Sequence, residues 1–149
     1  MDNDREYKLV NSMLVNLFQE ILKLEEKAII TEEFKDLTNN DMHVIEAIGI
    51  GDGRNMSAIA KILGITVGSL TISVNALVKK GYVARTRSEE DRRVVLVSLT
   101  EKGVKAYRHH EDYHHKMTMA VLSAFDEEER KVLMKLLDAI EDFFDGYSG

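Results

Sequence analysis

Two short helical segments joined at a glycine, and followed at once by a β-hairpin, constrain the fold of this chain more than any other feature. Asn55 can cap a helix from Met56 to Leu63, and Gly64 stands where a glycine commonly ends a helix. Thr66 can cap a second helix from Val67 to Lys80, with a further glycine directly after it. Two helices with so tight a turn between them indicate a helix-turn-helix unit.

The segment after the second helix has the composition of strands. Residues 82–87 and 92–98 are rich in β-branched side chains, and the polar residues 88–91 between them are typical of a turn. These segments predict a β-hairpin with a charged tip. Four arginines lie within nine positions near that tip: Arg85, Arg87, Arg92 and Arg93. Such a cationic projection suits phosphate or a narrow minor groove, whereas a solvated hairpin with arginine–glutamate pairs is the alternative.

Further helices flank this central unit. Apolar residues recur at spacings of three and four over the first 30 residues, which indicates a long amphipathic helix. A helix over about residues 41–48 follows, and a glycine-rich connector spans residues 49–53. Thr100 can cap a helix to about residue 124, and a capping-box pattern at residue 126 starts a last helix. The terminal helices carry more apolar surface than the central unit can cover, so we expect them to pack against a second copy of the chain.

The charge of the chain is unevenly distributed. Its 149 residues carry a net charge of −6, yet residues 54–105 hold 10 basic and 4 acidic side chains. A basic middle between acidic ends indicates a local surface for a polyanion, and chance clustering of surface charge is the alternative. The chain has no cysteine, which excludes disulfides and thiolate zinc sites. Because no apolar run approaches the ~20 residues of a membrane helix and no signal-peptide layout is present, we expect a cytoplasmic protein with no membrane partner.

The second helix of the helix-turn-helix unit has two unlike faces. At 100° per residue, the side that we expect to pack on the domain carries Val67, Leu70, Val74, Leu77 and Val78. The other side has no acidic group and carries side chains that could enter the major groove of DNA. The candidate DNA-contacting residues of this helix are Ser69, Thr71, Ile72, Asn75 and Lys79. The alternative is a core helix with a second packed face.

These features together resemble the MarR (multiple antibiotic resistance regulator) family of winged helix-turn-helix transcription regulators. Residues 37–41, 67–83, 85–93 and 99–103 carry the resemblance, which covers essentially the whole chain. An Asp-x-Arg pair in the hairpin is the family's marker. Here it consists of Asp91, which we expect to brace the guanidinium by a charge-assisted hydrogen bond, and Arg93.

The resemblance implies a mainly α fold with a small β-wing and a triangular homodimer bound to a palindromic operator in double-stranded DNA. It implies a single domain over residues 1–149. Within that domain, the helix-turn-helix and wing would span about residues 55–98. The dimerisation helices would lie at about residues 4–31 and 100–146.

Within the family, the chain looks most like the branch that represses fatty-acid biosynthesis genes. Residues 42–45 and 85–95 match that branch, together with two histidines of the long helix. The resemblance implies no bound cofactor and a long acyl chain, carried on acyl carrier protein, as the effector. The expected ligand pocket is lined by Phe18, Ile21, His43, Ile45, Tyr107, His110 and His114. The expected landing surface for the acidic carrier protein consists of Lys102, Lys105 and Arg108.

The histidines also support a metal site as an alternative. His110 and His114 are one helical turn apart, a spacing that can present two imidazoles to one metal ion. In zinc-sensing members of the family, a histidine occupies the position of His43, but the carboxylate usual beside it is replaced here by Met42. A zinc site would therefore combine the three histidines with an acidic residue from elsewhere, for which the candidates are Glu25, Glu26 and Asp112.

The sequence lacks the signatures of an enzyme. It contains no phosphate loop, no HExxH, and no spacing that places a nucleophile beside a base. We therefore predict a sequence-specific DNA-binding transcription regulator that represses fatty-acid biosynthesis genes. The alternatives are a repressor that responds to zinc or to a small aromatic ligand, and, in another class, a winged helix reused as a protein-interaction module.

Overall fold

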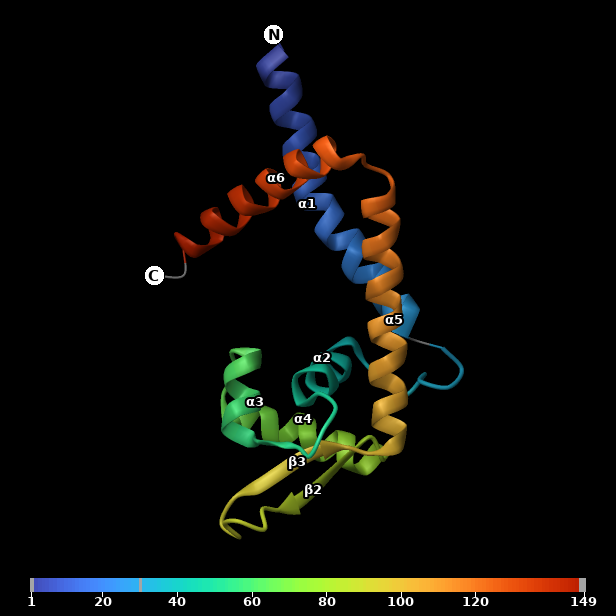
Figure 1. Ribbon diagram of the computed structural model, residues 1–149, viewed down its shortest axis with the longest axis vertical. Helices are drawn as coiled ribbons and strands as arrows, with labels where there is room; N and C mark the ends of the chain where they lie inside the picture. Colours follow the sequence, from blue (N-terminus) through green and yellow to red (C-terminus); the bar gives the residue numbers. More distant parts are fainter. Residues whose placement is uncertain (1, 30, 148–149) are drawn as a thin grey trace. The chain divides into compact units, whose positions relative to one another are not determined.

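The computed structural model describes residues 2–29 and 31–147 (Figure 1). Its elements are α1 (Asp2–Ile29), α2 (Asn39–Ile48), β1 (Arg54–Asn55), α3 (Met56–Leu63), α4 (Val67–Lys80), β2 (Val83–Arg87), β3 (Val95–Leu99), α5 (Glu101–Ser123) and α6 (Glu127–Asp145). Their order agrees with the sequence prediction, apart from the additional short strand β1. The protein is therefore mainly α with one small sheet, the architecture of a winged helix-turn-helix.

The chain divides into two compact units, residues 1–111 and residues 112–149. The first unit holds α1 to α4, the sheet and the start of α5, while the second holds the rest of α5 and all of α6. The buried core lies within the first unit, whereas no described residue of α6 is buried. That the whole chain acts as a single domain stays a prediction.

Side-chain caps set where the helices begin. Thr38 accepts a hydrogen bond from the backbone of Asp41, and the Asp41 carboxylate accepts one from the backbone of Thr38, so α2 starts with a complete capping box. The predicted N-caps of the other helices are also present: Asn55 on α3, Thr66 on α4, and Asp126 with Glu129 on α6. Gly64 and Gly81 end α3 and α4 with φ of 65° and 84°, which is the left-handed region that favours glycine.

The three strands form one antiparallel sheet in the order β1-β3-β2. In the β2–β3 wing, Arg85 lies opposite Val97. The strand β1 follows the connector expected at residues 49–53, and its Arg54 pairs with the same Val97 from the other side. The sequence pattern does not show β1, because its partner lies about 40 positions away and two residues carry no periodicity. Figure 1 shows the wing projecting beyond the helices of the first unit.

The core of the first unit consists of apolar side chains from α2, α3, α4, the sheet and the start of α5, and from the segments just before α2 and β2. Its largest fully buried members are Tyr82, Met42, Ile45, Ile48, Ile59, Leu70, Leu77, Val44, Val74 and Val97. Of the five residues predicted for the packing face of α4, Leu70, Val74 and Leu77 are buried. Val67 and Val78 are exposed, because they lie at the edge of that face next to the exposed side of the helix. Because this face is enclosed, the opposite face of α4 is held in a fixed position at the surface.

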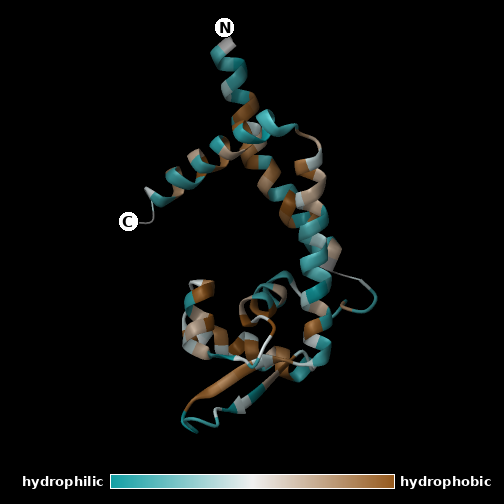
Figure 2. Cartoon of the chain, viewed as in Figure 1, coloured by the Kyte–Doolittle hydropathy of each residue, from teal (hydrophilic) through white to brown (hydrophobic). Residues whose placement is uncertain are grey.

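Large apolar side chains are exposed along α1 and α6, where Figure 2 shows brown residues recurring between polar ones. On α1 they include Leu9, Met13, Leu14, Leu17 and Phe18, and on α6 they include Val132, Leu136, Leu137, Phe143 and Phe144. Spacings of three and four residues place each set on a stripe of its helix. Over residues 2–29 and 31–147, no single helix is long and apolar enough to cross a membrane. Taken together, α3 and α4 are long and apolar enough, but the two helices are bent by 105° relative to each other.

Candidate nucleic-acid interface

The exposed face of α4 carries four of the five residues of this helix that were predicted to contact DNA. Ser69, Ile72, Asn75 and Lys79 are all exposed. Ile72 is 73% exposed, and an apolar side chain so open to solvent suits contact with a thymine methyl group. Thr71 is different, because it is half-buried and its hydroxyl donates a hydrogen bond to the Val67 carbonyl at 2.8 Å. That hydroxyl is engaged within the helix.

The turn of the wing is held by short-range hydrogen bonds. The Ser88 amide donates to the Val94 carbonyl, and the Val94 amide donates to the Asp91 carbonyl, each at 2.9 Å. The Asp91 carboxylate accepts a hydrogen bond from the backbone N–H of Arg93 at 3.0 Å. We expected it to hold the Arg93 guanidinium, but within the described residues Asp91 forms no ion pair with an arginine. An aspartate that bonds the N–H two residues on closes a local turn without ordering a long side chain.

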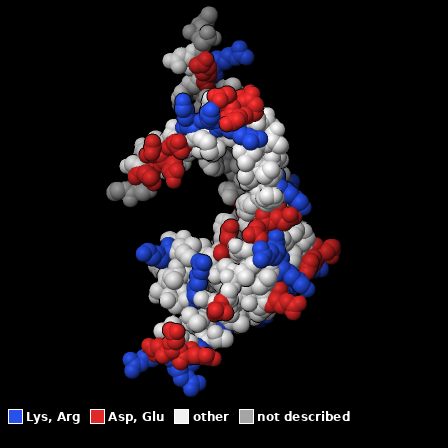
Figure 3. Space-filling model, in the orientation of Figure 1, with Lys and Arg blue, Asp and Glu red and all other residues white. Residues whose placement is uncertain are grey.

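The wing arginines differ in their partners. Arg87 donates to the Arg92 carbonyl at 3.2 Å, and Arg85 donates to the Asn75 amide oxygen at 2.6 Å. The side chains of Arg92 and Arg93 are exposed. Figure 3 shows basic and acidic atoms gathered at the wing, yet none of the four arginines forms an ion pair with a glutamate among the described residues. The guanidinium groups therefore have donors available for phosphate.

Replacing Arg93 with alanine should weaken DNA binding by about 1–3 kcal/mol and reduce the slope of log K against log salt by about one. Asp91→Ala should also weaken binding, although it removes a negative charge, because the Arg93 backbone loses its acceptor. Fluorescence anisotropy of a labelled duplex over a range of salt concentrations measures both effects. Glu90→Ala is the matched control, since it removes an exposed acid of the same turn and should leave binding equal or slightly tighter. An Asp91→Ala protein that binds DNA more tightly would show that the turn needs no brace.

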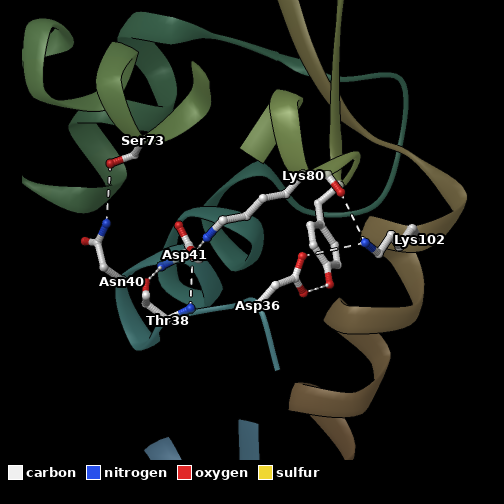
Figure 4. A network of polar contacts seen from close by, with 8 residues as sticks. Asp36, Thr38, Asn40, Asp41, Ser73, Lys80 and Lys102 are labelled. Carbon is white, nitrogen blue, oxygen red and sulfur yellow. Dashed lines mark hydrogen bonds and ion pairs between the residues drawn. The ribbon is translucent and has the colours of Figure 1, made fainter. Parts of the chain in front are cut away.

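Polar contacts connect the start of α2 with α4 (Figure 4). Lys80, in the last turn of α4, donates to the capping-box carboxylate of Asp41 at 2.7 Å. Asp41 is buried, so this ion pair is shielded from water more than a surface pair. About two turns earlier in α4, the Asn40 amide donates to the Ser73 hydroxyl at 3.3 Å. These contacts hold α4 at two points along its length.

A second cluster in Figure 4 connects the segment before α2 with the start of α5. The hydroxyl of buried Tyr82 donates to Asp36 at 2.7 Å, and the Lys102 ammonium lies 3.8 Å from the same carboxylate and 4.1 Å from the centre of the Tyr82 ring. Burial opposes ionisation of Asp36, but the hydrogen bond from Tyr82 and the charge of Lys102 outweigh it and lower the pKa of Asp36. Burial and the bond to Asp36 raise the pKa of Tyr82 above its ordinary value.

The predicted histidine site brings together residues from three helices of the first unit. The imidazole Nε2 of buried His110, on α5, lies 2.9 Å from a carboxylate oxygen of Glu25 on α1, which is itself buried. His43, on α2, lies 3.9 Å from the same oxygen. His109 hydrogen-bonds the Ala28 carbonyl at 2.9 Å instead. Of the acidic residues that the sequence offered, the structure thus brings Glu25 beside two of the predicted histidines.

Residues 35–94, from the segment before α2 to the wing, match the model of the MarR family. The chain is also 30% identical to the HTH-type transcriptional regulator BilQ of Clostridium symbiosum over 99 residues, which are 66% of this chain and 69% of BilQ. The chain belongs to the MarR family. The family recognised from the helix-turn-helix and the Asp-x-Arg wing is therefore confirmed.

Other MarR-type relatives cover more or less of the chain. The structure of Streptococcus pneumoniae FabT in complex with DNA has a TM-score of 0.85 and 36% identity, and it covers 94% of this chain and 98% of FabT. The HTH-type regulator YpoP of Bacillus subtilis is 29% identical over 92 residues, which are 62% of this chain and 63% of YpoP. These relatives are transcription regulators and not enzymes. Like them, this MarR-family chain is a DNA-binding transcription regulator.

The residues expected to form the effector pocket of this MarR-family chain lie in different environments. Ile45 is fully buried in the core of the first unit, where it packs the fold instead of lining a pocket. Phe18 is exposed on α1, Ile21 is half-buried, and Tyr107 packs partly against the core. His43 lines a pocket of about 390 Å³, together with Glu46, Ala47, Arg54, Ile62 and Leu63. The seventh predicted residue, His114, belongs to the second unit.

The three basic residues predicted to receive a carrier protein all have acidic partners. Lys102 lies 3.8 Å from Asp36, and Lys105 lies 3.9 Å from Glu101. The Arg108 guanidinium is 2.7 Å from a carboxylate oxygen on the next turn of α5. These are surface ion pairs, which typically stabilise by about 0–1 kcal/mol, so an acidic partner could replace them at little cost.

The sequence patterns missed several residues of the interface. Asn40 and Ser73 are 33 positions apart, and Asp36 and Tyr82 are 46 apart, so no local spacing signals either contact. Lys80 had one signal, its place in the last turn of α4, which indicated a favourable interaction with the helix dipole. Nothing in the sequence pointed to Asp41 as its partner.

Proposed function

We propose that this MarR-family regulator is a homodimeric repressor of fatty-acid biosynthesis genes, with a long acyl chain on acyl carrier protein as corepressor. The observation that carries the proposal is its likeness to DNA-bound FabT, at 36% identity over 94% of the chain. The sequence resemblance of residues 42–45 and 85–95 to the fatty-acid branch of the family supports the same assignment.

Homodimerisation is supported by the apolar stripes on α1 and α6. When a second copy of the chain covers this apolar surface, its removal from water stabilises the dimer. A two-fold dimer presents two copies of α4, which fit a palindromic operator whose half-sites are centred about 34 Å apart, one turn of DNA. In this arrangement α4 enters the major groove, and the wing arginines contact phosphate or the adjacent minor groove.

The proposed corepressor acts by burying its acyl chain. Each methylene removed from water contributes roughly 0.8 kcal/mol, so two further carbons strengthen binding by about tenfold until the pocket is full. If the bound acyl chain favours a dimer in which the two copies of α4 have the separation that matches the operator, it increases the fraction of protein that can bind DNA. The carboxylates of the acidic carrier protein would replace the acidic side chains that now pair with Lys102, Lys105 and Arg108.

One operator titration tests the corepressor. A palindromic duplex recovered from random DNA by selection is titrated with protein alone, with long-chain acyl carrier protein and with short-chain acyl carrier protein, each in the presence of a chelator. We expect the affinity for the duplex to rise with chain length. Unacylated carrier protein is the control and should have little effect. If long-chain and unacylated carrier protein gave the same affinity, the acyl corepressor would be excluded.

A zinc-responsive repressor is a second candidate function, favoured by one observation. Buried Glu25 lies within 4 Å of the imidazole nitrogens of both His110 and His43, and His114 follows His110 by one turn of α5. A carboxylate with imidazoles is a donor set that zinc accepts. In this function Glu25, His43 and His110 would hold the ion, which would supply a connection between α1, α2 and α5 within the first unit.

The same titration distinguishes zinc from the acyl chain. In the zinc case, DNA affinity changes with added zinc, returns to its starting value with a chelator, and does not respond in His43→Ala. Equilibrium dialysis gives the zinc stoichiometry of each protein directly. His115→Ala is the matched control, because that exposed histidine of α5 lies outside the set. Retention of zinc by His43→Ala at wild-type affinity would remove His43 from the site.

A further inference from the structure

One hydrogen bond connects the wing with the exposed face of α4. The Nη2 of Arg85, in the middle of β2, donates to Oδ1 of Asn75 at 2.6 Å. Both side chains are exposed, and 10 positions separate them in the sequence. Only two residues lie between the end of α4 at Lys80 and the start of β2 at Val83, so the strand leaves the helix beside its last turns.

The bond fixes the orientation of the Asn75 amide. A carboxamide has one acceptor end and one donor end, and these ends can be exchanged by a rotation of the side chain. Guanidinium groups only donate hydrogen bonds, so the end that faces Arg85 must be the oxygen. The NH₂ end of Asn75 is then left for another partner, and no residue in the described ranges accepts a hydrogen bond from it.

We propose that Arg85 is a positioning residue that makes Asn75 read the major groove through its NH₂ end. A free asparagine pairs with adenine through both ends, accepting from N6 and donating to N7. The guanidinium takes up one of the two lone pairs of the Asn75 oxygen and fixes the orientation of the amide, so Asn75 is a poorer acceptor for the adenine amine. Its NH₂ group instead suits the acceptor-bearing edges of guanine, at O6 and N7, or of thymine, at O4. The inference rests on the proposed role of α4 in base reading.

Arg87 provides an internal comparison. It lies two residues further along β2, so it is on the same side of the strand as Arg85, and its guanidinium donates to the Arg92 carbonyl within the wing. It forms no hydrogen bond or ion pair with α4 among the described residues. Loss of Arg87 should therefore remove charge from the wing without changing the side chains that face the bases.

Selection from a random duplex library, followed by sequencing, tests the inference. The proteins compared are the wild type, Asn75→Ala, Arg85→Met and Arg87→Met. We expect the wild type to favour guanine or thymine over adenine at one position of each half-site, and Asn75→Ala to relax that position. Arg85→Met should raise the frequency of adenine there on the order of tenfold, because the released amide can pair through both ends. Arg87→Met should lower affinity for all sequences and keep the preference.

Three results would overturn the inference while leaving base reading by α4 intact. They are adenine at the Asn75 position in the wild type, an unchanged preference in Arg85→Met, and an unchanged preference in Asn75→Ala. A wild-type protein that enriches no sequence would instead contradict the proposed sequence-specific function, and the inference would fail with it. Circular dichroism of each variant ensures that a changed preference is measured on folded protein.

Discussion

Replacing Gly103 with alanine should destabilise the fold by at least about 3 kcal/mol. Gly103 lies in the first turn of α5 and is buried against the chain that leaves α4. A Cβ atom at this position would overlap the carbonyl oxygen of Tyr82 and lie 3.1 Å from its carbonyl carbon. The overlap cannot be relieved by a side-chain rotation, because both Tyr82 atoms belong to the backbone and the next atom that it meets is the Cβ of Leu99, at 3.2 Å.

Hydrogen bonds hold that backbone in place. The Tyr82 carbonyl accepts from the Thr100 amide at 3.0 Å, and the Thr100 hydroxyl donates to the Gly81 carbonyl at 2.6 Å. Moving α5 away would break these bonds and expose the Tyr82 ring. The loss is measured by denaturant unfolding at a fixed protein concentration, because oligomerisation makes stability depend on concentration.

Gly68→Ala is the matched control for this substitution. Gly68 also lies in a helix, but a Cβ there would meet only the Thr66 hydroxyl, at 3.9 Å, among the described atoms. Alanine at this position should stabilise α4 by about 0.5–1 kcal/mol, since it removes the backbone freedom of glycine without a clash. A Gly103→Ala protein within 1 kcal/mol of the wild type would show that α5 can shift at little cost.

Replacing Leu17 with aspartate should convert the proposed dimer into monomers and reduce operator affinity by a hundredfold or more. Leu17 is 49% exposed and lies at the centre of the apolar stripe of α1. Two-fold symmetry repeats each substitution, so two carboxylates would be buried in one interface, each costing several kcal/mol without a partner. A monomer binds one half-site at a time. It loses the high effective concentration of a second α4 and wing that a dimer holds beside the other half-site.

Sedimentation velocity at micromolar concentration measures the assembly, and a titration of the palindromic duplex measures the affinity. Gln19→Glu is the control, because it adds a charge to α1 at a position about 160° around the helix from Leu17. It should leave both the dimer and the affinity unchanged. A Leu17→Asp protein that sediments as a dimer would move the dimer interface away from this stripe.

The local elements of the protein follow from its sequence. Thr66 and Gly81 bound the recognition helix α4 through contacts between residues at most four positions apart, and such contacts can be read from spacing alone. The two faces of α4 follow from the same periodicity, which separates buried Leu70 and Val74 from exposed Ile72. The family also follows, because its marker lies within the single turn that carries Asp91 and Arg93.

A side chain with more than one reachable partner is not placed by spacing alone. Asp91 was predicted to bond the Arg93 guanidinium, whereas its carboxylate bonds the Arg93 backbone, which is closer and already ordered. Ile45 was predicted to line a ligand pocket, whereas its side chain is enclosed by the core. Periodicity identifies an apolar face but does not distinguish a face that packs against the fold from one that lines a cavity.

The sequence by itself determined the helices, their caps, the wing and the centre of the buried face of α4, because these depend on interactions between residues close in the chain. The tertiary structure alone decided which distant side chains meet: Glu25 with His110, Asp41 with Lys80, and Asn75 with Arg85. Each of these pairs joins two elements whose approach is set by burial of the whole core. Burial is nearly non-directional, so the same apolar pattern is compatible with many pairings of surface groups until the elements are packed.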